Sequence, residues 1–509
     1  MPTTDHPVPG GPGPRDAATT ADDAGVPAEY VPLQAVALSD AERWPTLPGA
    51  DLARVVAARE HPAAPRWVHA TGDRLDAADL AALEARFPGA RAPGGAGDTA
   101  VARVDAARDV DVADVPDWVL ELVERAHRTI PRYRGAVREG RSGPRTPLHE
   151  LPTVRRRDLV TSLAAHVPVD VPLDRVLHGT SSGSTGSALL VPLHPRAVAA
   201  DLLLVHALVE AAGARWTVDP GRLGLVNLVD QRAAFTYVSA MSAFPRPDGT
   251  PAPLMARVNL DTSSWRRADD RARWFAAHDP QVVSTSALPL THLLDLAEAG
   301  LAVRPLAVVN GATHVTPAVR ARARDLWGAA LVDLYGLRET GPVAAASSDG
   351  AGHVLVDRRV HVEVVDAAGR PLPAGVRGEV VVTADENPYL PLLRYRTGDH
   401  ASLGRDASGR VVLEGLEGRA AVLFTDARGA GRPSIDATQV LQTAGLVAWH
   451  LHQDADGAVR LRAVPGDAAG AEQAARAVGA WLGRPVELEV LGDVAELGEG
   501  KPARYTRST

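Results

Sequence analysis

Residues 330–341 read Ala-Leu-Val-Asp-Leu-Tyr-Gly-Leu-Arg-Glu-Thr-Gly, an apolar strand-like run followed by an aromatic ring, a glycine turn and a carboxylate. An aromatic ring before a glycine can stack on a purine. A carboxylate a few residues later can hold Mg²⁺ against phosphate, because this ion prefers hard oxygen ligands. Tyr335, Gly336 and Glu339 are therefore candidate nucleotide-site residues, although an ordinary salt-bridged turn would explain the same sequence.

Strand-like and helical segments alternate on the N-terminal side of this stretch, which indicates parallel strands with crossover helices and hence an α/β fold. The apolar runs are 223–229, 281–284, 306–309 and 330–334, and the helical stretches are 196–211, 290–299 and 317–327. From Gly378 the pattern changes to the β-rich segments 378–383 and 411–414. After a break at 415–418 comes a compact tail with a helix over 471–482 and a strand over 486–490.

Four regions follow from these patterns. Residues 1–28 read as a disordered leader because Pro, Gly, Asp and Thr leave little to bury. Residues 29–115 look like an appended N-terminal subdomain of unknown role, with a helix over 76–86 behind a cap at Asp76. Residues 116–417 form the large domain, opened by a helix over 118–133, and residues 418–509 form a small α+β domain.

Length, charge and cysteine count exclude several classes of protein. A chain of 509 residues suggests two or three domains. The net charge of -8 argues against nucleic acid, which needs clustered cations. We expect a cytoplasmic protein, since no apolar run is long enough to span a bilayer and no hydrophobic signal core precedes Asp23. The absence of cysteine excludes thiol nucleophiles and thiolate metal sites.

A loop of small residues is the sharpest local feature. Thr180-Ser181-Ser182-Gly183-Ser184-Thr185-Gly186-Ser187 lies between two strand-like runs. Such a loop can wrap amides and hydroxyls around phosphate oxygens without steric cost, so it reads as a phosphate cradle. It is not the strand-loop-helix nucleotide loop, because no Gly-Lys-Ser/Thr follows. A flexible Gly/Ser loop is the alternative.

Two further features lie towards the C-terminus. In Arg394-Tyr395-Arg396-Thr397-Gly398-Asp399, a carboxylate on a turn could accept hydrogen bonds from both ribose hydroxyls. Of the 54 basic residues, 53 are arginine and the single lysine is Lys501. A chain that otherwise avoids lysine has a reason to keep this one, because a compact ammonium and a planar guanidinium are not interchangeable.

The order of these features resembles the adenylate-forming superfamily of acyl-CoA ligases, peptide-synthetase adenylation domains and luciferases. The Ser/Thr/Gly loop is followed by Tyr-Gly-x-x-Glu at 335–339, Tyr-Arg-Thr-Gly-Asp at 395–399, Gly-x-Glu-Gly-Arg at 415–419 and Gly-Lys at 500–501. Residues 130–134, 151–159 and 391–399 are most similar to phenylacetate-CoA ligases. The resemblance extends from about residue 116 to the end and implies ATP and Mg²⁺ as cofactors, with a mobile C-terminal lid over the site.

The resemblance also implies a role for each candidate residue. Lys501 would bridge the substrate carboxylate and the α-phosphate as the acyl oxygen attacks. Glu339 would hold Mg²⁺, Asp399 would bind ribose, and Arg419 would reach ribose or phosphate. The remaining implied contacts, to the phosphates and the adenine, are those of Thr180, Ser181, Ser182, Gly183, Ser184, Thr185, Gly186, Gly311, Ala312, Tyr335 and Gly336.

Three positions depart from the family pattern. Ser187 stands where relatives usually carry lysine, and Arg338 stands where a small hydroxyl residue is usual. We hypothesise that Arg338 supplies the phosphate-facing cation that the loop lacks. Ala420 replaces the aspartate on which the small domain usually swivels, so adenylation is better supported than transfer to CoA.

The expected function is ATP-dependent activation of a small, aromatic or similarly compact carboxylic acid in bacterial secondary metabolism. The acyl group would pass to CoA, a carrier-protein thiol or an amine. Phe235-Thr236-Tyr237 could line the acid site, although core packing explains these residues equally well. Two alternatives stay open: nitrite-dependent N-N bond formation on the same fold, and a non-catalytic nucleotide-binding relative. We expect a homodimer, the commonest assembly.

Overall fold

The computed structural model describes residues 38–508 with internal gaps. The gaps are 88–114, 182–188, 231–233, 312–314, 348–351, 357, 419–421, 435–436, 438–440, 442–443, 467–468 and 499–502. The expected leader therefore lies outside the described residues. Among the residues that are described, no helix is long and apolar enough to cross a bilayer.

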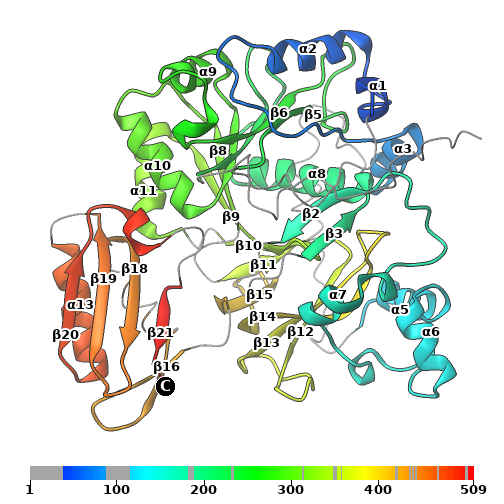
Figure 1. Ribbon diagram of the computed structural model, residues 1–509. Helices are drawn as coiled ribbons and strands as arrows, with labels where there is room; N and C mark the ends of the chain where they lie inside the picture. Colours follow the sequence, from blue (N-terminus) through cyan, green and yellow to red (C-terminus); the bar gives the residue numbers. More distant parts are fainter. Residues whose placement is uncertain are drawn as a thin grey trace, which may run out of the picture.

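A mixed sheet of 13 strands organises most of the described chain (Figure 1). Its parallel part runs in the order β6, β4, β7, β8, β9, with β5 antiparallel at the outer edge. These strands are β4 (Leu225–Val229), β5 (Tyr237–Ala240), β6 (Leu254–Asn259), β7 (Val282–Thr285), β8 (Ala307–Gly311) and β9 (Ala330–Leu337). The four predicted strand runs and the parallel arrangement are confirmed.

Helices cover both faces of the parallel strands, which explains why the strands read as unbroken apolar runs. The helices are α8 (Pro195–Ala211), α9 (Asp270–His278), α10 (Ala287–Glu298) and α11 (Pro317–Trp327). Val209 of α8 shares a core with Val282 and Val309, whereas Leu290 of α10 shares one with Val308. Neighbouring residues of one strand thus face opposite layers, as the two-residue period of a strand requires.

The sheet continues beyond β9 into antiparallel strands that form the predicted β-rich lobe. They are β10 (Gly341–Ala346), β11 (His353–Leu355), β12 (Val360–Val365), β13 (Gly378–Ala384), β14 (Leu392–Arg405) and β15 (Val411–Glu417), with β1 (Val154–Arg155) pairing β14. The helices α5 (Asp117–Thr129), α6 (Pro131–Arg138) and α7 (Arg156–Ser162) lie beside this lobe (Figure 1). A separate hairpin, β2 (Leu177–Ser181) and β3 (Leu189–Leu193), flanks residues 182–188.

The N-terminal residues 40–86 pack on both faces of the sheet edge and have no separate core. They form α1 (Asp40–Arg43), α2 (Gly49–Arg59) and α3 (Ala77–Arg86), the last capped by Asp76 as predicted. Trp44 and Val55 join the core of β5, β6 and α9, whereas Leu83 packs against α8. Residues 60–76, between α2 and α3, cross the edge of the sheet at the start of β5, and we call them the N-terminal strap.

The C-terminal residues form a four-stranded sheet with a helix and a hydrophobic core of their own (Figure 1). The elements are β16 (Leu423–Thr425), β17 (Gly431–Pro433), β18 (Leu446–Gln453), β19 (Val459–Pro465), α13 (Gly470–Leu482), β20 (Val486–Val490) and β21 (Tyr505–Arg507). Val447 packs against α11 and Leu288 packs against the β19–β20 side of this unit. The unit therefore contacts the helices next to β8 and β9.

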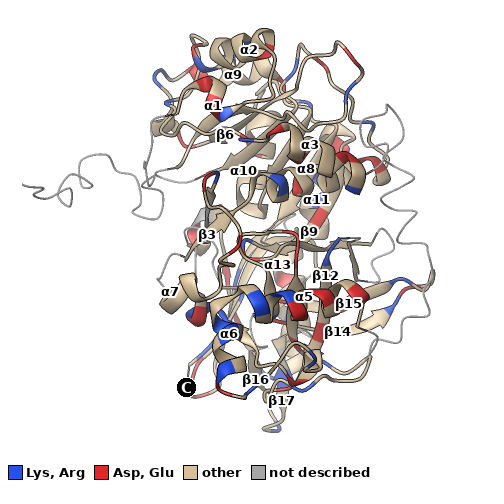
Figure 2. Cartoon of the chain, turned by 90° about the vertical axis from the view of Figure 1, so that its right-hand side faces the viewer, with Lys and Arg blue, Asp and Glu red and all other residues tan. Residues whose placement is uncertain are grey.

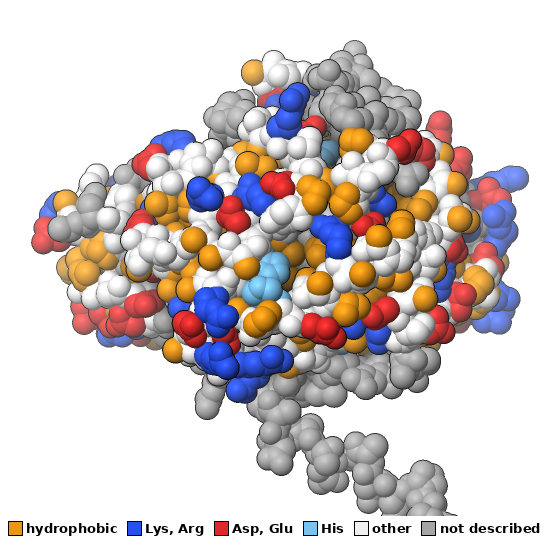
Figure 3. Space-filling view, turned by 90° about the horizontal axis from the view of Figure 1, so that it is seen from above, with side chains coloured by type: hydrophobic (Ala, Val, Ile, Leu, Met, Phe, Trp, Pro, Cys, Tyr) orange, Lys and Arg blue, Asp and Glu red, His pale blue; other side chains and the backbone are white. Residues whose placement is uncertain are grey.

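Basic and acidic residues alternate along much of the described chain (Figure 2). Seen from above, the described part of the face shows apolar side chains between isolated acidic and basic ones (Figure 3). Nucleic acid binding needs cations gathered along one surface to displace counterions. On the described part of the face in Figure 3, acidic side chains lie next to basic ones.

Candidate active site

Tyr335 and Asp399 meet although 64 residues separate them. The Tyr335 hydroxyl, on β9, donates a hydrogen bond of 2.8 Å to Oδ2 of Asp399, on β14. The Asp399 amide donates to Oγ1 of Thr397 at 3.0 Å, which fixes the carboxylate further. Burial raises the pKa of Tyr335 well above its ordinary value, and the adjacent Asp399 charge raises it too. The phenol is therefore a permanent donor beside a carboxylate.

The predicted turn at Asp399 is wrong. Asp399 lies inside the long strand β14, where the pairing with β13 shifts register and Gly398 adopts a φ of +82°. This irregularity, a bulge, turns the strand locally and re-aims a side chain without ending the ladder. The neighbouring Arg394 is structural, since its guanidinium bonds Glu363 at 3.0 Å and the carbonyl of Leu151 at 2.8 Å.

Glu339 forms a second polar pair close to the first. Nη1 of Arg156, the first residue of α7, donates to Oε1 of Glu339 at 2.9 Å. The Glu339 side chain is 5% exposed and that of Arg156 is 25% exposed. Tyr395 lies beside them: its pKa is raised by burial first and by the negative charge of Glu339 second. Glu339 is thus a buried carboxylate that pairs with Arg156 and lies beside Tyr395.

The glycines of this turn are required by close packing. A Cβ at Gly336 would lie 2.8 Å from the carbonyl oxygen of Gly341 on the facing strand. Gly341 has a φ of +73°, and a Cβ there would lie 2.7 Å from Nη1 of Arg358. Arg358 is in turn paired with Asp201 of α8. The turn that carries Glu339 is therefore packed tightly against the backbone of β10 and the Arg358 side chain.

Arg338 does not join the pair formed by Arg156 and Glu339. Its side chain is exposed, and its charge acts on the carboxyl of Asp201. Burial raises the pKa of Asp201, and the cations Arg358 and Arg338 oppose that rise. The hypothesis that Arg338 faces the phosphates stays a prediction.

Several predicted site residues lie outside the described part of the chain, namely Ser182, Gly183, Ser184, Thr185, Gly186, Ala312, Arg419 and Lys501. The described residues next to these gaps show where the chain enters and leaves each of them. Thr180 and Ser181 end β2, and Gly311 ends β8 opposite Leu334 of β9. A Cβ at Gly418 would lie 3.5 Å from Oδ1 of Asp399.

The end of the chain lies close to the same strand. Burial lowers the pKa of Arg504, and the charges of Asp333 and Glu417 oppose that change. Arg504 also lies 5.1 Å above the ring of Trp449, in β18. Asp333 belongs to β9 and accepts a hydrogen bond of 2.7 Å from Nδ2 of Asn310. The chain that follows Lys501 is therefore near β9, two residues before Tyr335.

Arg156 and Tyr395 were not singled out from sequence as site residues. Arg156 lies within the run Arg155-Arg156-Arg157, which follows a short strand and carries no motif for phosphate by itself. The available signal was the cluster of three arginines next to Asp158, in a region that resembles phenylacetate-CoA ligases. Only the fold brings Arg156 to Glu339 across 183 residues.

Mg²⁺, the metal that the family resemblance implies, fits this site if substrate phosphates and water supply most of its ligands. The described residues hold no group of three or more His, Asp or Glu side chains suited to a metal ion. Mg²⁺ is commonly bound by one or two carboxylates together with substrate phosphates and water, not by an all-protein cage. The single buried carboxylate of Glu339 suits that mode.

Comparisons with known proteins agree with this geometry. Residues 174–387 match the family described as AMP-binding enzyme. The phenylacetate-coenzyme A ligase of Thermus thermophilus is 28% identical over 301 residues, which cover 56% of this chain and 64% of that protein. That of Aromatoleum evansii is 37% identical over 95 residues, covering 18% and 22%. The chain thus spans less than two thirds of either relative.

A solved structure shows the same fold. The crystal structure of 2-hydroxyisobutyryl-CoA ligase in the postadenylation state, in complex with R3-HIB-AMP, has a TM-score of 0.55 and 19% sequence identity. The match covers 77% of this chain and 88% of that one. The chain therefore shares the fold of that ligase, residues 174–387 match the AMP-binding enzyme family, and the sequence is similar to phenylacetate-coenzyme A ligases.

Proposed function

We propose that the protein is an ATP-dependent ligase that activates a small aromatic carboxylic acid as an acyl-adenylate and releases pyrophosphate. The observation that carries this proposal is the convergence of Tyr335, Asp399 and Glu339 from β9, its following turn and β14. In open α/β sheets, ligands bind outside the carboxyl ends of the strands. Tyr335 and Glu339 lie at and just after the end of β9, within the residues that match the AMP-binding enzyme family, and Asp399 of β14 bonds Tyr335.

Each described side chain has a distinct role in this proposal. The Asp399 carboxylate accepts hydrogen bonds from ribose hydroxyls while the Tyr335 ring packs against the adenine. Mg²⁺, when bound at Glu339, would neutralise charge on the phosphates and orient them. The Arg156 guanidinium, which lies beside Glu339, would bind the phosphate oxygens, as the planar fork of arginine allows.

We assign the step that forms the acyl-adenylate bond to Lys501 of the C-terminal domain. A substrate carboxylate oxygen attacks the α-phosphorus, and the bond to pyrophosphate breaks. Lys501 would neutralise the charge that both groups bring together. Arg504, three residues later, is half-buried and feels the charge of Asp333, which supports an approach of Lys501 to the end of β9.

The second step passes the acyl group to a nucleophile and releases AMP. We propose a thiol, with CoA as the first choice because the named relatives are CoA ligases. A carrier-protein thiol or an amine would need the same attack on the acyl carbon. Ala420, in place of the usual hinge acid, predicts that thioester formation is slower than adenylation.

The test is pyrophosphate release from Mg-ATP across a panel of aryl and alkyl acids, repeated with nitrite plus aromatic amines. Lys501→Ala serves as the blank, and Lys501→Arg asks whether a guanidinium suffices. We expect acid-dependent release in the wild type and near-background release in both variants. Pyrophosphate release only with nitrite and an amine would favour N-N bond formation. No pyrophosphate release under any of these conditions would favour a non-catalytic role.

A further inference from the structure

A histidine and a carboxylate meet at the edge of the parallel sheet. Nδ1 of His292, in the second turn of α10, lies 2.6 Å from Oδ2 of Asp230, the residue that follows β4. The two side chains are 38% and 29% exposed, so a ligand can reach them. No described residue bonds Nε2, the other nitrogen of the ring. A carboxylate that accepts from Nδ1–H leaves Nε2 as a proton acceptor, the arrangement in which histidine acts as a base.

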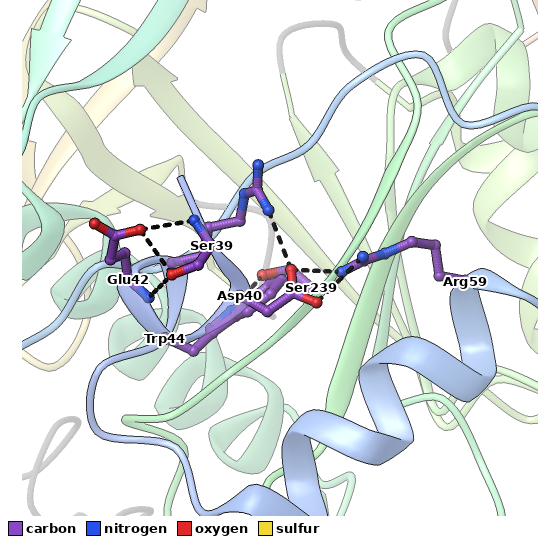
Figure 4. A network of polar contacts seen from close by, with 7 residues as sticks. Ser39, Asp40, Glu42, Trp44, Arg59 and Ser239 are labelled. Carbon is purple, nitrogen blue, oxygen red and sulfur yellow. Dashed lines mark hydrogen bonds and ion pairs between the residues drawn. The ribbon is translucent and has the colours of Figure 1, made fainter. Parts of the chain in front are cut away.

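Two other polar clusters are structural by comparison. Oδ1 of Asp40, in α1, accepts a hydrogen bond of 3.1 Å from Arg59 of α2, which joins the N-terminal helices (Figure 4). In the C-terminal domain, both ring nitrogens of His452 are engaged, Nδ1 by Thr506 at 2.7 Å and Nε2 by Asp454 at 3.0 Å. The ring of His292 differs because a described residue bonds only one of its nitrogens.

The register of the sheet places Asp230 level with Tyr335. Asn227 of β4 is connected through paired residues of β7 and β8 to Val332 of β9, and Asp230 and Tyr335 each lie three residues further on. β4 is the third strand from β9, so the two residues are roughly 14 Å apart at about 4.8 Å per strand. Both lie at the carboxyl ends of parallel strands, where α/β sheets bind ligands.

Asp230 and Tyr335 also turn to the same face of the sheet. Val226 of β4 and Leu331 of β9 both pack in cores that include leucines of α10. Because side chains alternate between the faces of a strand, the residues four positions later, Asp230 and Tyr335, share this face. The bond between Asp230 and His292 of α10 agrees. In an acyl-adenylate, ribose and one phosphate separate the adenine from the acyl carbon. With the adenine at Tyr335, a nucleophile activated beside Asp230 can approach that carbon from the opposite side.

We propose that His292 is the general base of the second step, and that Asp230 is the positioning residue that holds its ring. The proposal rests on the proposed function. Nε2 takes the proton of the acceptor while the acceptor sulfur, or the nitrogen of an amine, bonds to the acyl carbon. The bond from that carbon to the phosphate oxygen breaks, AMP leaves, and the proton passes from the imidazole to water. A thiol with a pKa of about 8.5 is mostly protonated at neutral pH, so a base speeds its attack.

The charges around His292 predict how the transfer step depends on pH. The hydrogen bond to Asp230 raises the pKa of His292 above its ordinary value of 6.5, although burial opposes the rise. Arg271 of α9 also opposes it, and Asp295 of α10 adds to it. A base needs the neutral imidazole. The transfer rate of the wild type should therefore fall as the pH decreases through a midpoint above 6.5.

The test measures the two steps separately. Acid-dependent exchange of labelled pyrophosphate into ATP reports adenylation, and product formation after CoA or aniline is added to the preformed acyl-adenylate enzyme reports transfer. We expect His292→Ala to slow transfer about 100-fold, the lower end of general base catalysis, while exchange keeps most of its rate. The midpoint in the pH profile of transfer should disappear. Asp230→Asn, which keeps an oxygen acceptor for Nδ1–H, should slow transfer by a smaller factor.

His149→Ala is the matched control. The His149 side chain is 59% exposed, and its closest recorded carboxylate, Glu150, is 3.9 Å away, beyond hydrogen-bond distance. Its loss should change neither step. Equal slowing of exchange and transfer in His292→Ala would make the pair structural. Unchanged transfer in that variant, or a wild type that transfers the acyl group to neither CoA nor aniline, would also overturn the proposal. A wild type without acid-dependent exchange would instead refute the proposed function, and this proposal with it.

Discussion

Replacing Arg156 with alanine separates a phosphate-binding role from a purely structural one. Nη1 of Arg156 lies 2.9 Å from Oε1 of Glu339, whose side chain is 5% exposed. A hydrogen bond to a charged group is worth about 1.5–3 kcal/mol, or roughly a 10- to 100-fold change in an equilibrium constant. The 25% exposure of Arg156 favours the lower end. If the guanidinium turns to phosphate when Mg-ATP binds, Arg156→Ala should raise the KM for ATP about 10-fold.

Arg157→Ala is the matched control. The neighbouring Arg157 side chain is 82% exposed, and its closest recorded carboxylate, Asp158, is 3.9 Å away. Its loss should change neither KM. The assay is steady-state pyrophosphate release with ATP and acid varied in turn, together with the thermal midpoint of each variant. Arg156→Lys should recover part of the ATP affinity because it keeps the charge.

Two outcomes would refute the reasoning. An unchanged KM for ATP with a lowered thermal midpoint would make Arg156 a structural partner of Glu339 only. A raised KM for ATP in Arg338→Ser but not in Arg156→Ala would give the phosphate role to Arg338. Because the side chain of Arg338 is exposed, we expect the smaller effect there.

Further expectations concern three other parts of the molecule. Tyr335→Phe removes the 2.8 Å bond to Asp399 and should raise the KM for ATP about 10-fold, with the KM for the acid unchanged. Gly336→Ala places a Cβ 2.8 Å from a backbone oxygen and should lower the thermal midpoint and the rate, whereas Gly143→Ala, with nothing within 4 Å, should change neither. Burial raises the pKa of Asp73 to about 6, so the folded protein holds this proton more tightly than the unfolded chain does. Protonation of Asp73 therefore stabilises the fold by about 3 kcal/mol below pH 3.8, and this stabilisation is lost as the pH rises through 6. Protection factors for hydrogen exchange in the strap, which correct for the faster intrinsic exchange at higher pH, should therefore be larger at pH 4.5 than at pH 7.5, and Asp73→Asn should remove the difference; equal protection factors at both pH values in the wild type would contradict this.

The architecture was predictable because each strand of the parallel sheet is covered on both faces. The runs at 223–229 and 306–309 are continuously apolar, and the structure has β4 and β8 there. The helix ends were marked as well: α11 has Thr316 as its cap, and Gly328 ends it with a φ of +65°. Local sequence carries such signals, so they are available before the fold is known.

Contacts between distant segments were not predictable in the same way. The pattern of 394–399 suggested a turn, but the surrounding strands β13 and β15 keep Asp399 inside a ladder with a bulge. The pairing of Arg156 with Glu339 depends on α7 lying against β14, which no local pattern specifies. The N-terminal strap reads as mixed polar sequence, and its place beside β5 follows from backbone bonds to Thr236.

The central claim is that a carboxylate oxygen attacks the α-phosphate. Its most direct test is to supply a substrate acid labelled with ¹⁸O in both carboxylate oxygens, add Mg-ATP and the acceptor, and measure the AMP by mass spectrometry. We expect one ¹⁸O in the AMP that is released, and no labelled AMP with Lys501→Ala. Label found in inorganic phosphate, or turnover that releases unlabelled AMP, would contradict adenylate formation.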